Sequence, residues 1–345
     1  MAKAVKLADI AAKVGVSTVT VSKALSGQKG VSEEMREKIR KLAEEMGYKQ
    51  PSATRREVHR AKSYNIGVLI EEEYLDKYES FYWKMYQEVS VSALRCECFA
   101  LMEVVSGSME EQMELPKVVR EHKVHGLIVI GRLPGGYLKK LREKSSVPLV
   151  YLDFTDEEPG TDAVVSDNYY GAYHLVNYLL NQGHDRIAYV GTLLATSSIT
   201  DRYFGYAKAL MERGIRLRED WQMDDRNVDS GVIQEELLQL PEEMPTAFFC
   251  NCDLTAGKLI QKLRAQGYRV PEDVSVVGFD NYIFPGVCDV EITTYEVDQA
   301  EMATRAVGIL LKRMEDQPYR YGTHVVEGRL VIKDSVGLNK AAAVQ

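Results

Sequence analysis

Leu7-Ala-Asp-Ile-Ala-Ala-Lys-Val-Gly15-Val-Ser-Thr-Val-Thr-Val21-Ser-Lys-Ala-Leu25 is the stretch that decides how the N-terminal part of this chain folds. Apolar residues recur at helical spacing up to Val14, Gly15 interrupts them, and a second helical pattern follows Ser17. Glycine tolerates the positive φ of a tight corner, and serine is a good N-cap. The pattern therefore predicts two short helices joined by a tight turn, as in a helix-turn-helix.

The second of these helices has a polar outer face. Thr18, Val19, Ser22 and Lys23 are expected to point away from the core, offering hydroxyl groups, a methyl surface and one cation. Such groups contact phosphates, thymine methyl groups and guanine in a DNA major groove. An ordinary helical hairpin inside a larger core is the alternative, but it does not need a polar second helix with a basic end.

A third helix and a basic segment complete the N-terminal region. Ser32 is expected to cap a helix whose apolar stripe runs from Met35 to Met46, and Gly47 ends it. The segment 51–63 that follows is basic and has little apolar periodicity, so it is interpreted as a linker that could order on DNA. The expected divisions are a helix-turn-helix domain at 1–50, this hinge at 51–63, and a larger body at 64–345.

Charge is distributed unevenly along the 345 residues. Residues 1–62 hold 14 Lys and Arg against 7 Asp and Glu, whereas the remainder holds 29 against 44. The net charge is therefore +7 on the N-terminal region and −15 on the rest. This asymmetry indicates that only the N-terminal region contacts a polyanion.

From residue 65 onward, short apolar runs alternate with amphipathic segments of helix length. This rhythm predicts parallel β-sheets covered by helices on both faces, in two doubly wound subdomains with a cleft between them. The first subdomain is expected at about 64–165 and 293–323, and the second at about 166–292 and 324–338. The predicted strands are 66–70, 99–102, 126–130, 149–152, 187–190, 247–250 and 274–278.

Several classes of protein are disfavoured. No apolar stretch is long enough for a membrane span and the N-terminus has no apolar signal core, so a cytoplasmic protein is expected. No glycine-rich nucleotide motif or nucleophile elbow is present, and no cofactor is expected. The five cysteines are expected to be reduced, and the spacing of the Cys-x-Cys pairs at 96–98 and 250–252 argues against a metal site.

Several motifs together resemble the family of lac repressor and purine repressor type regulators. In the N-terminal region they are Val14-Gly-Val-Ser-Thr-Val-Thr-Val-Ser-Lys-Ala-Leu-Ser26 and Glu45-Met-Gly-Tyr48. In the body they are Gly183-His-Asp-Arg-Ile-Ala-Tyr-Val-Gly191, Asp201-Arg-Tyr-Phe-Gly-Tyr206 and Val270-Pro-Glu-Asp-Val-Ser-Val-Val-Gly-Phe-Asp-Asn281. The resemblance implies a dimeric repressor whose periplasmic-binding-protein-like body closes on a small effector, commonly a sugar or a nucleobase.

The resemblance also implies which residues contact a double-stranded, pseudo-palindromic DNA operator. Lys23 stands where relatives usually have Arg or His, so the bidentate fork is lost there. In the hinge, Val58 takes the place of a leucine that wedges into the minor groove, if one residue is inserted before Pro51. The residues assigned to DNA are Leu7, Ser17, Thr18, Val19, Thr20, Ser22, Lys23, Lys29, Ser52, Arg55, Arg56 and Val58.

In the body, the resemblance places effector-binding residues at the cleft. Arg202 and Asp280 match the most dependable ligand positions, although they could instead pair with each other. Cys252 stands where many relatives have a ligand-binding Asn, and Arg226 lies near their aromatic lid. The residues assigned to the effector are Phe81, Tyr82, Ser197, Ser198, Arg202, Arg226, Cys252, Asp253 and Asp280.

Two arginines in one cleft suggest an acidic effector, such as a uronic acid or a phosphorylated sugar. Two other classes of function remain as alternatives. A sugar-transport protein could share the body, but it would need an export signal and no basic head. A sugar-modifying enzyme could use Asp253 and Asp280 as general acid and base, but it would leave the head unexplained. The C-terminus lacks leucine heptads, so a homodimer is expected rather than a tetramer.

Overall fold

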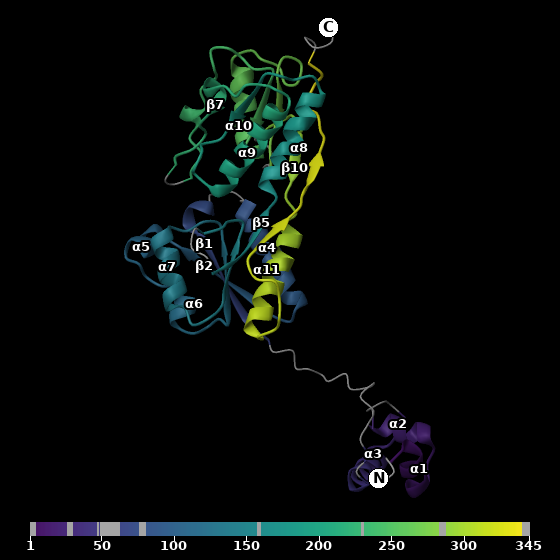
Figure 1. Cartoon of the computed structure of the whole chain (residues 1–345). Coiled ribbons are helices and arrows are strands. Elements are labelled where there is room, and N and C mark those ends of the chain that lie inside the picture. Colours follow the sequence, from purple (N-terminus) through teal and green to yellow (C-terminus); the bar gives the residue numbers. More distant parts are fainter. Residues whose placement is uncertain are drawn as a thin grey trace. The chain divides into compact units, whose positions relative to one another are not determined.

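The computed structural model describes residues 5–25, 30–46, 48, 63–75, 81–156, 160–228, 231–282 and 288–339. The chain divides into two compact units, residues 1–62 and 63–345 (Figure 1). Each unit has its own hydrophobic core and is described by itself. Among the described residues, no helix is both long and apolar enough to cross a membrane.

The described part of the smaller unit contains three helices, α1 (Leu7–Val14), α2 (Thr18–Leu25) and α3 (Glu33–Glu45). Gly15 ends α1 with φ at 78°, and its N–H donates to the carbonyl of Ala11. Ser17 caps α2, because its Oγ accepts from Thr20 N at 3.1 Å. The predicted helix-turn-helix is therefore confirmed. The shared core consists of Ile10, Ala11, Val21, Ala24, Ile39 and Ala43.

The first sheet of the larger unit has six strands among the described residues, all paired in parallel. Their spatial order is β11-β5-β4-β3-β1-β2. One face packs against α4 (Phe81–Arg95) and α11 (Gln299–Met314), and the other packs against α7 (Gly135–Lys144). The strands are β1 (Asn65–Glu71), β2 (Phe99–Val105), β3 (Gly126–Ile130), β4 (Leu149–Leu152), β5 (Asp162–Ser166) and β11 (Thr323–Val326).

The second sheet of the larger unit has the order β7-β6-β8-β9 and is also parallel in its described strands. Helices α8 (Asn168–Asn181) and α9 (Ser197–Glu212) pack on one face, and α10 (Asp253–Ala265) packs on the other. The periplasmic-binding-protein-like body of two doubly wound parallel sheets is thus confirmed. The strands are β6 (Ile187–Val190), β7 (Gln222–Met223), β8 (Ala247–Cys250) and β9 (Ser275–Val277).

Three chain segments connect the two sheets. One joins β5 to α8, one joins β10 (Thr294–Glu296) to α11, and one joins β11 to β12 (Arg329–Val331). β10 and β12 pair antiparallel, and the yellow C-terminal segment runs beside β10 in Figure 1. Because β11 still pairs with β5, the chain leaves the first sheet after residue 326, three residues beyond the expected division.

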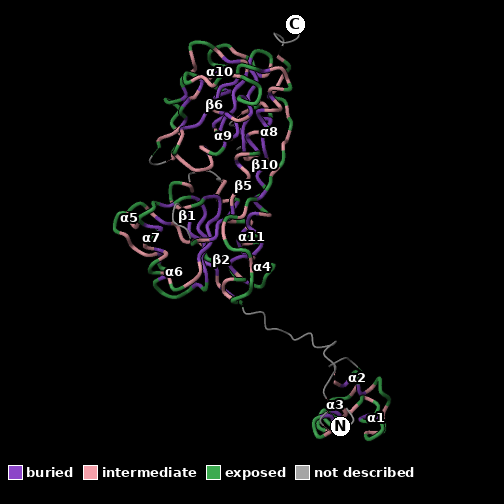
Figure 2. The backbone as a smooth tube through the Cα atoms, in the orientation of Figure 1, coloured by how far each residue is buried: buried purple, intermediate pink, exposed green. Residues whose placement is uncertain are grey.

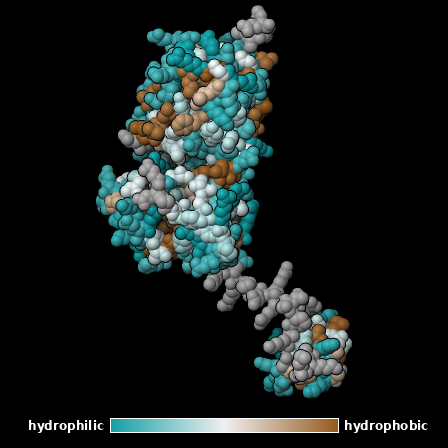
Figure 3. All heavy atoms as spheres, viewed as in Figure 1, coloured by the Kyte–Doolittle hydropathy of each residue, from teal (hydrophilic) through white to brown (hydrophobic). Residues whose placement is uncertain are grey.

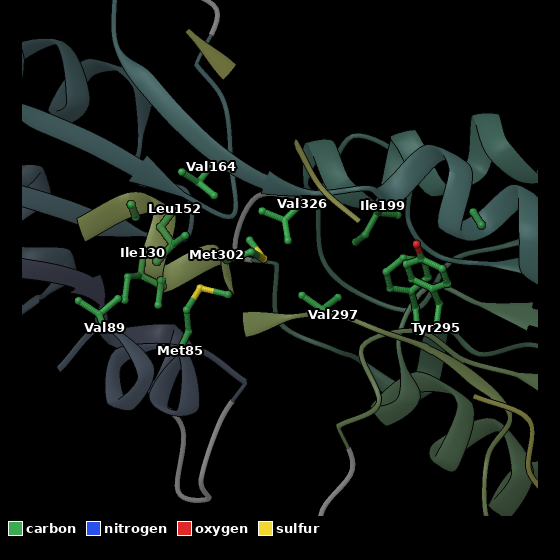
Figure 4. Packing of buried hydrophobic residues seen from close by; sticks show 14 of the residues in the cluster. Met85, Val89, Ile130, Leu152, Val164, Ile199, Tyr295, Val297, Met302 and Val326 are labelled. Carbon is green, nitrogen blue, oxygen red and sulfur yellow. The ribbon is translucent and has the colours of Figure 1, made fainter. Parts of the chain in front are cut away.

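Buried residues are concentrated in the strands and the inner helix faces of the larger unit (Figure 2). One cluster continues from the first sheet into the second without a gap. In Figure 4, Met85 and Ile130 lie toward one end of this cluster, Val297 and Val326 lie in its middle, and Tyr295 lies toward the other end. The connecting segments are therefore part of the core, which places the carboxyl ends of both sheets near each other.

The remaining described helical elements are short and lie between strands. They are α5 (Gly107–Glu111), α6 (Lys117–Arg120) and the 3₁₀ turns Glu72–Tyr74, Glu219–Trp221 and Glu235–Leu237.

Candidate effector site and DNA-contacting helix

Arg202 is the most constrained side chain at the candidate effector site. It lies on α9, is 5 % exposed, and stacks over the Phe279 ring with its guanidinium carbon 3.8 Å from the ring centroid. Its Nε donates to Asn168 Oδ1 at 2.8 Å, and Nη1 donates to the carbonyl of Asn251 at 2.5 Å. Its Nη2 lies 3.0 Å from Asp280 Oδ1. The two residues expected at the effector cleft, Arg202 and Asp280, therefore form an ion pair with each other.

Asp280 sits where the chain leaves β9, with an unusual positive φ of 97°. Its N–H donates to the carbonyl of Tyr295 at 2.8 Å, which fixes the backbone in this conformation. Burial raises the pKa of the Asp280 carboxyl, and the charge of Arg202 opposes that rise. A carboxylate held in a strained backbone beside a buried guanidinium is typical of a functional site.

Asp253 lies behind this pair and is 2 % exposed. Its Oδ2 accepts from Tyr282 N at 2.9 Å, and its Oδ1 presses against Gly278, where a Cβ would come within 2.1 Å. Burial, with a smaller contribution from the charge of Asp280, raises the pKa of Asp253 well above its usual value. The carboxyl accepts hydrogen bonds from the backbone N–H of Tyr282 and from the side chain of Thr294, which oppose this rise.

Arg226, the second predicted cation, also has a carboxylate partner. Its Nη2 lies 2.7 Å from Asp225 Oδ2 and donates to Asn251 Oδ1 at 2.8 Å. Asp225 is fully buried, and its carboxylate also accepts from Thr255 Oγ1 at 2.6 Å and from Thr192 N at 3.0 Å. Burial alone would raise the pKa of Asp225, but Arg226 and these hydrogen bonds lower it to about 2. The positive charge of Arg226 is thus compensated within the protein.

Cys252 caps α10 next to this network. Its Sγ accepts from Thr255 N at 3.5 Å and lies 3.6 Å from Arg226 Nη2. Burial raises the pKa of the Cys252 thiol despite the nearby guanidinium, so the sulfur is a thiol and not a thiolate at neutral pH. The five cysteines are free, and no cluster of His, Cys, Asp and Glu within the described ranges could hold a metal ion.

The first sheet contributes Asp153, which the sequence analysis missed. It directly follows β4, has φ of 72°, and is 8 % exposed. Its Oδ1 has no hydrogen-bond partner among the described residues. Burial raises its pKa to about 7, while Arg202 and a hydrogen bond from Tyr82 lower it and Asp280 raises it. Asp153 therefore lies close to the pair of Arg202 and Asp280 from the second sheet.

A recognisable signal could have identified Asp153. It is the first charged residue after a fully apolar strand, and ligands of parallel α/β sheets bind at the carboxyl ends of the strands. Asn168, Asn251 and Asp225 were also missed. These polar residues form hydrogen bonds or an ion pair with Arg202 or Arg226 and so orient the two side chains. Their spacing in the sequence does not indicate which arginine each of them contacts.

The predicted aromatic residues begin α4. Both are half-buried, and the Phe81 carbonyl accepts from Gln299 Nε2 at 3.1 Å. The Phe81 ring centroid lies 6.2 Å from that of Tyr282, just beyond Asp280 in the chain. The Tyr82 centroid lies 4.8 Å from that of Tyr74, and Tyr82 contacts Asp153 by its hydroxyl. Both aromatic residues are therefore near the carboxylates of the site.

The two predicted serines lie at the start of α9. Ser197 and Ser198 are half-buried, and Ser198 Oγ lies 2.9 Å from Thr196 Oγ1, which caps the helix. Both serines lie about one helical turn before Arg202 on the same helix, α9.

On the smaller unit, α2 presents the outer face expected from the sequence. Thr18, Val19, Ser22 and Lys23 are exposed, and Val19 is 60 % exposed although it is apolar. Thr20 is half-buried, and Ser17 uses its hydroxyl to cap the helix. Leu7 is half-buried against the core. The predicted contacts Lys29, Ser52, Arg55, Arg56 and Val58 lie outside the described residues.

A helix-turn-helix with an exposed apolar and hydroxyl-bearing second helix, joined to a two-sheet body with a polar site at its strand ends, defines a ligand-responsive DNA-binding regulator. Residues 6–51 match the family described as bacterial regulatory proteins, lacI family, and residues 176–336 match the periplasmic binding protein-like domain. The HTH-type transcriptional repressor CytR of Escherichia coli K12 is 30 % identical over 336 residues, covering 96 % of each chain. This chain belongs to the lacI family of bacterial transcriptional repressors.

Further relatives agree with this placement. The HTH-type transcriptional repressor PurR of Vibrio campbellii is 27 % identical over 337 residues, covering 95 % of this chain and 97 % of that protein. A cellobiose complex of the transcriptional regulator CelR has the same fold, with a TM-score of 0.68 at 24 % identity over 96 % of this chain and 99 % of that one. The lac repressor dimer bound to operator gives a TM-score of 0.64 at 23 % identity over 97 % and 100 %. The enzyme alternative is excluded by the family.

Proposed function

We propose that this repressor binds a pseudo-palindromic operator as a homodimer and that a small carbohydrate-like effector, held between its two sheets, controls operator affinity. Two copies of α2 related by a two-fold axis would read two half-sites. Action on operator DNA implies a cytoplasmic location. Solved structures of similar fold that hold cellobiose, ribose or D-xylulofuranose support a sugar-like ligand.

The observation that carries the proposal is the geometry of Arg202. Its guanidinium is fixed by Asn168, Asn251 and Asp280, so it needs no reorganisation when a ligand arrives. Asp153, from the other sheet, keeps one buried carboxylate oxygen without a hydrogen-bond donor among the described residues. A ligand hydroxyl that reaches this oxygen would connect the two sheets.

Charge favours a neutral effector over the acidic one suggested by the sequence. That suggestion rests on two uncompensated arginines, but Arg202 pairs with Asp280 and Arg226 pairs with Asp225. Asp153 adds a further acidic group with a pKa of about 7. A uronate or sugar phosphate would meet more carboxylate than free guanidinium, whereas hydroxyl groups would supply the missing donors.

A thermal-shift screen of the full chain tests the ligand class. Matched sets are used, in which each neutral sugar is compared with its uronic acid and its phosphate, and nucleosides form a separate set. We expect a neutral member to raise the melting temperature, and its effect to be lost in Asp153→Asn and Arg202→Met. Stabilisation by an acid and not by its neutral counterpart would reject the neutral effector. Stabilisation by a nucleoside alone would replace the sugar-like class.

A further inference from the structure

Tyr295 is a buried residue that the proposed effector site does not include. It lies in β10, is 3 % exposed, and belongs to the core cluster that continues from one sheet to the other (Figure 4). It therefore adds little to the surface, where hydrophobic residues form separate patches among hydrophilic ones on the visible face (Figure 3). Its contacts are instead with the segments that connect the two sheets.

Tyr295 lies where the three connecting segments meet. It belongs to the second segment, which continues from β10 into α11. Its hydroxyl accepts from Gly328 N at 3.0 Å, and Gly328 lies in the third segment, between β11 and β12. Gly171, in the first turn of α8 directly after the first segment, packs against the ring, because a Cβ there would lie 2.7 Å from a ring carbon of Tyr295. One side chain is therefore in contact with all three connections.

The same residue supports the wall that the second sheet contributes to the effector site. The centroid of the Tyr295 ring lies 5.1 Å from that of Phe279, and the Arg202 guanidinium carbon lies 3.8 Å from the Phe279 centroid. The main-chain carbonyl of Tyr295 accepts from Asp280 N at 2.8 Å. Tyr295 therefore holds both members of the ion pair at the site, Arg202 through the Phe279 ring and Asp280 directly.

The hydroxyl of Tyr295 connects this wall to the segment that follows β11 of the first sheet. Burial raises the pKa of Tyr295 to about 12, so the hydroxyl is neutral at physiological pH. Tyr295 is paired with Leu330 across the antiparallel strands β10 and β12, and the bond to Gly328 is a second link between the same two segments. Any rotation of one sheet relative to the other has to be absorbed by the connecting segments. A hydrogen bond between two of these segments can therefore differ in strength between two arrangements of the sheets.

We infer that Tyr295 is a positioning residue that couples occupancy of the effector site to the arrangement of the two sheets. Its ring and carbonyl hold Arg202 and Asp280, and its hydroxyl fastens them to the segment that leaves the first sheet. The bond to Gly328 stabilises the arrangement that the structure shows, so its loss shifts the protein towards the alternative arrangement. The inference rests on the proposed function in one respect, namely that this shift alters operator affinity.

Amide hydrogen exchange of the full chain without ligand, read by mass spectrometry, tests the link between the hydroxyl and the site. Tyr295→Phe removes the hydroxyl but keeps the carbonyls of residues 295 and 293, which accept from Asp280 N and Gly278 N. We expect peptides covering these two amides to exchange roughly 2–10-fold faster than in the wild type, which corresponds to the loss of one hydrogen bond. Peptides covering β3 should be unchanged.

Tyr137→Phe is the matched control. Tyr137 is 1 % exposed, and its hydroxyl donates to the carbonyl of Glu114 at 2.7 Å. It lies in the core cluster on the α7 face of the first sheet, away from the connecting segments. This variant also removes a buried tyrosine hydroxyl with a backbone partner, but it should leave exchange at Asp280 and Gly278 unchanged.

Operator affinity, measured by fluorescence anisotropy with and without the stabilising ligand, separates coupling from a merely structural role. In Tyr295→Phe the ligand-free affinity should move roughly 2–10-fold towards the ligand-saturated value, while the ligand-saturated affinity stays at the wild-type value. A structural defect would instead lower the active fraction and leave both affinities as they are.

Three results decide the matter. Exchange at Asp280 and Gly278 that is the same in Tyr295→Phe as in the wild type overturns the inference. Faster exchange with an unmoved ligand-free affinity, in a protein whose wild type responds to the ligand, also overturns it. Faster exchange in a protein whose wild type shows no ligand effect on operator affinity overturns the proposed function, but it supports the link from Tyr295 to the site.

Discussion

At the scale of single residues, the site is organised by pairing of buried charges. Arg202 with Asp280 and Arg226 with Asp225 each place a guanidinium against a carboxylate where solvent is nearly excluded. Removing one partner of such a pair leaves a buried charge and is costly, whereas the intact pair contributes mainly to orientation. Asp153 and Asp253 have no guanidinium in an ion pair with them, and the Oδ1 atom of each accepts no hydrogen bond from the described residues.

Asp153→Asn should change how the stability of the protein depends on pH. The pKa of Asp153 is raised from 3.8 to about 7 in the folded state, so the folded protein binds this proton more tightly than the unfolded chain does. The resulting stabilisation is present below about pH 4 and is lost as pH rises through about 7. The asparagine of the variant does not titrate, so the variant does not lose this stabilisation as the pH rises. Urea unfolding should therefore show its stability relative to wild type increasing over that window, by at most roughly 4 kcal/mol.

Asp225→Asn is the matched control, because the sign is opposite. The pKa of Asp225 is lowered to about 2, so its contribution is present at neutral pH and is lost as pH falls below about 4. This variant should be less stable than wild type at pH 7, and the difference should shrink in acid. Parallel pH profiles for the two variants would contradict the charge assignments.

At the scale of elements, most strands and helices could be predicted from the sequence, because apolar runs and amphipathic segments alternate clearly. The runs at 126–130, 149–152, 187–190 and 247–250 coincide with β3, β4, β6 and β8. Gly15 and Ser17 also specified the turn and the cap that separate α1 from α2.

Short or half-polar strands were not predicted. β5 begins with Asp162, a buried carboxylate that accepts from the Tyr319 hydroxyl at 2.8 Å and from Gly322 N at 2.9 Å. A charged residue at the start of a strand interrupts the apolar pattern by which a buried strand is recognised. Its burial is explained only by hydrogen-bond partners that are distant in the sequence. β7, β10 and β12 have two or three residues, too few for a periodic pattern.

Two helix-interior glycines test the packing of α8 against α9. A Cβ at Gly205 would lie 2.2 Å from the Tyr169 carbonyl oxygen, whereas a Cβ at Gly308 in α11 meets nothing within 4 Å. Gly205→Ala should therefore lower the free energy of unfolding by about 1–3 kcal/mol through overpacking. Gly308→Ala should raise it by about 0.4–1 kcal/mol, because alanine restricts the unfolded chain. Denaturant unfolding measures both, and equal signs would contradict the close helix contact.

At the scale of the whole molecule, the sequence predicted the order of functional parts better than the detail of the site. The basic N-terminal unit and the acidic body are separate compact units, and the family comparison agrees with that order. Arg202, Asp280, Phe81 and Tyr82 lie near one another, and their contact with an effector stays a prediction. The acidic ligand was suggested by the number of arginines alone, without their carboxylate partners. The partner of Arg202 is Asp280, which is distant in the sequence, and the partner of Arg226 is the preceding residue, Asp225.

The central claim is that a ligand held near Arg202 governs how tightly α2 binds DNA. Its most direct test is the affinity of the full chain for a DNA site selected from a random pool, measured by fluorescence anisotropy with and without the stabilising ligand. We predict an inverted-repeat site, a ligand-dependent change in affinity of roughly 5–150-fold, and loss of that change in Arg202→Met. An affinity that the bound ligand leaves unchanged would contradict the account.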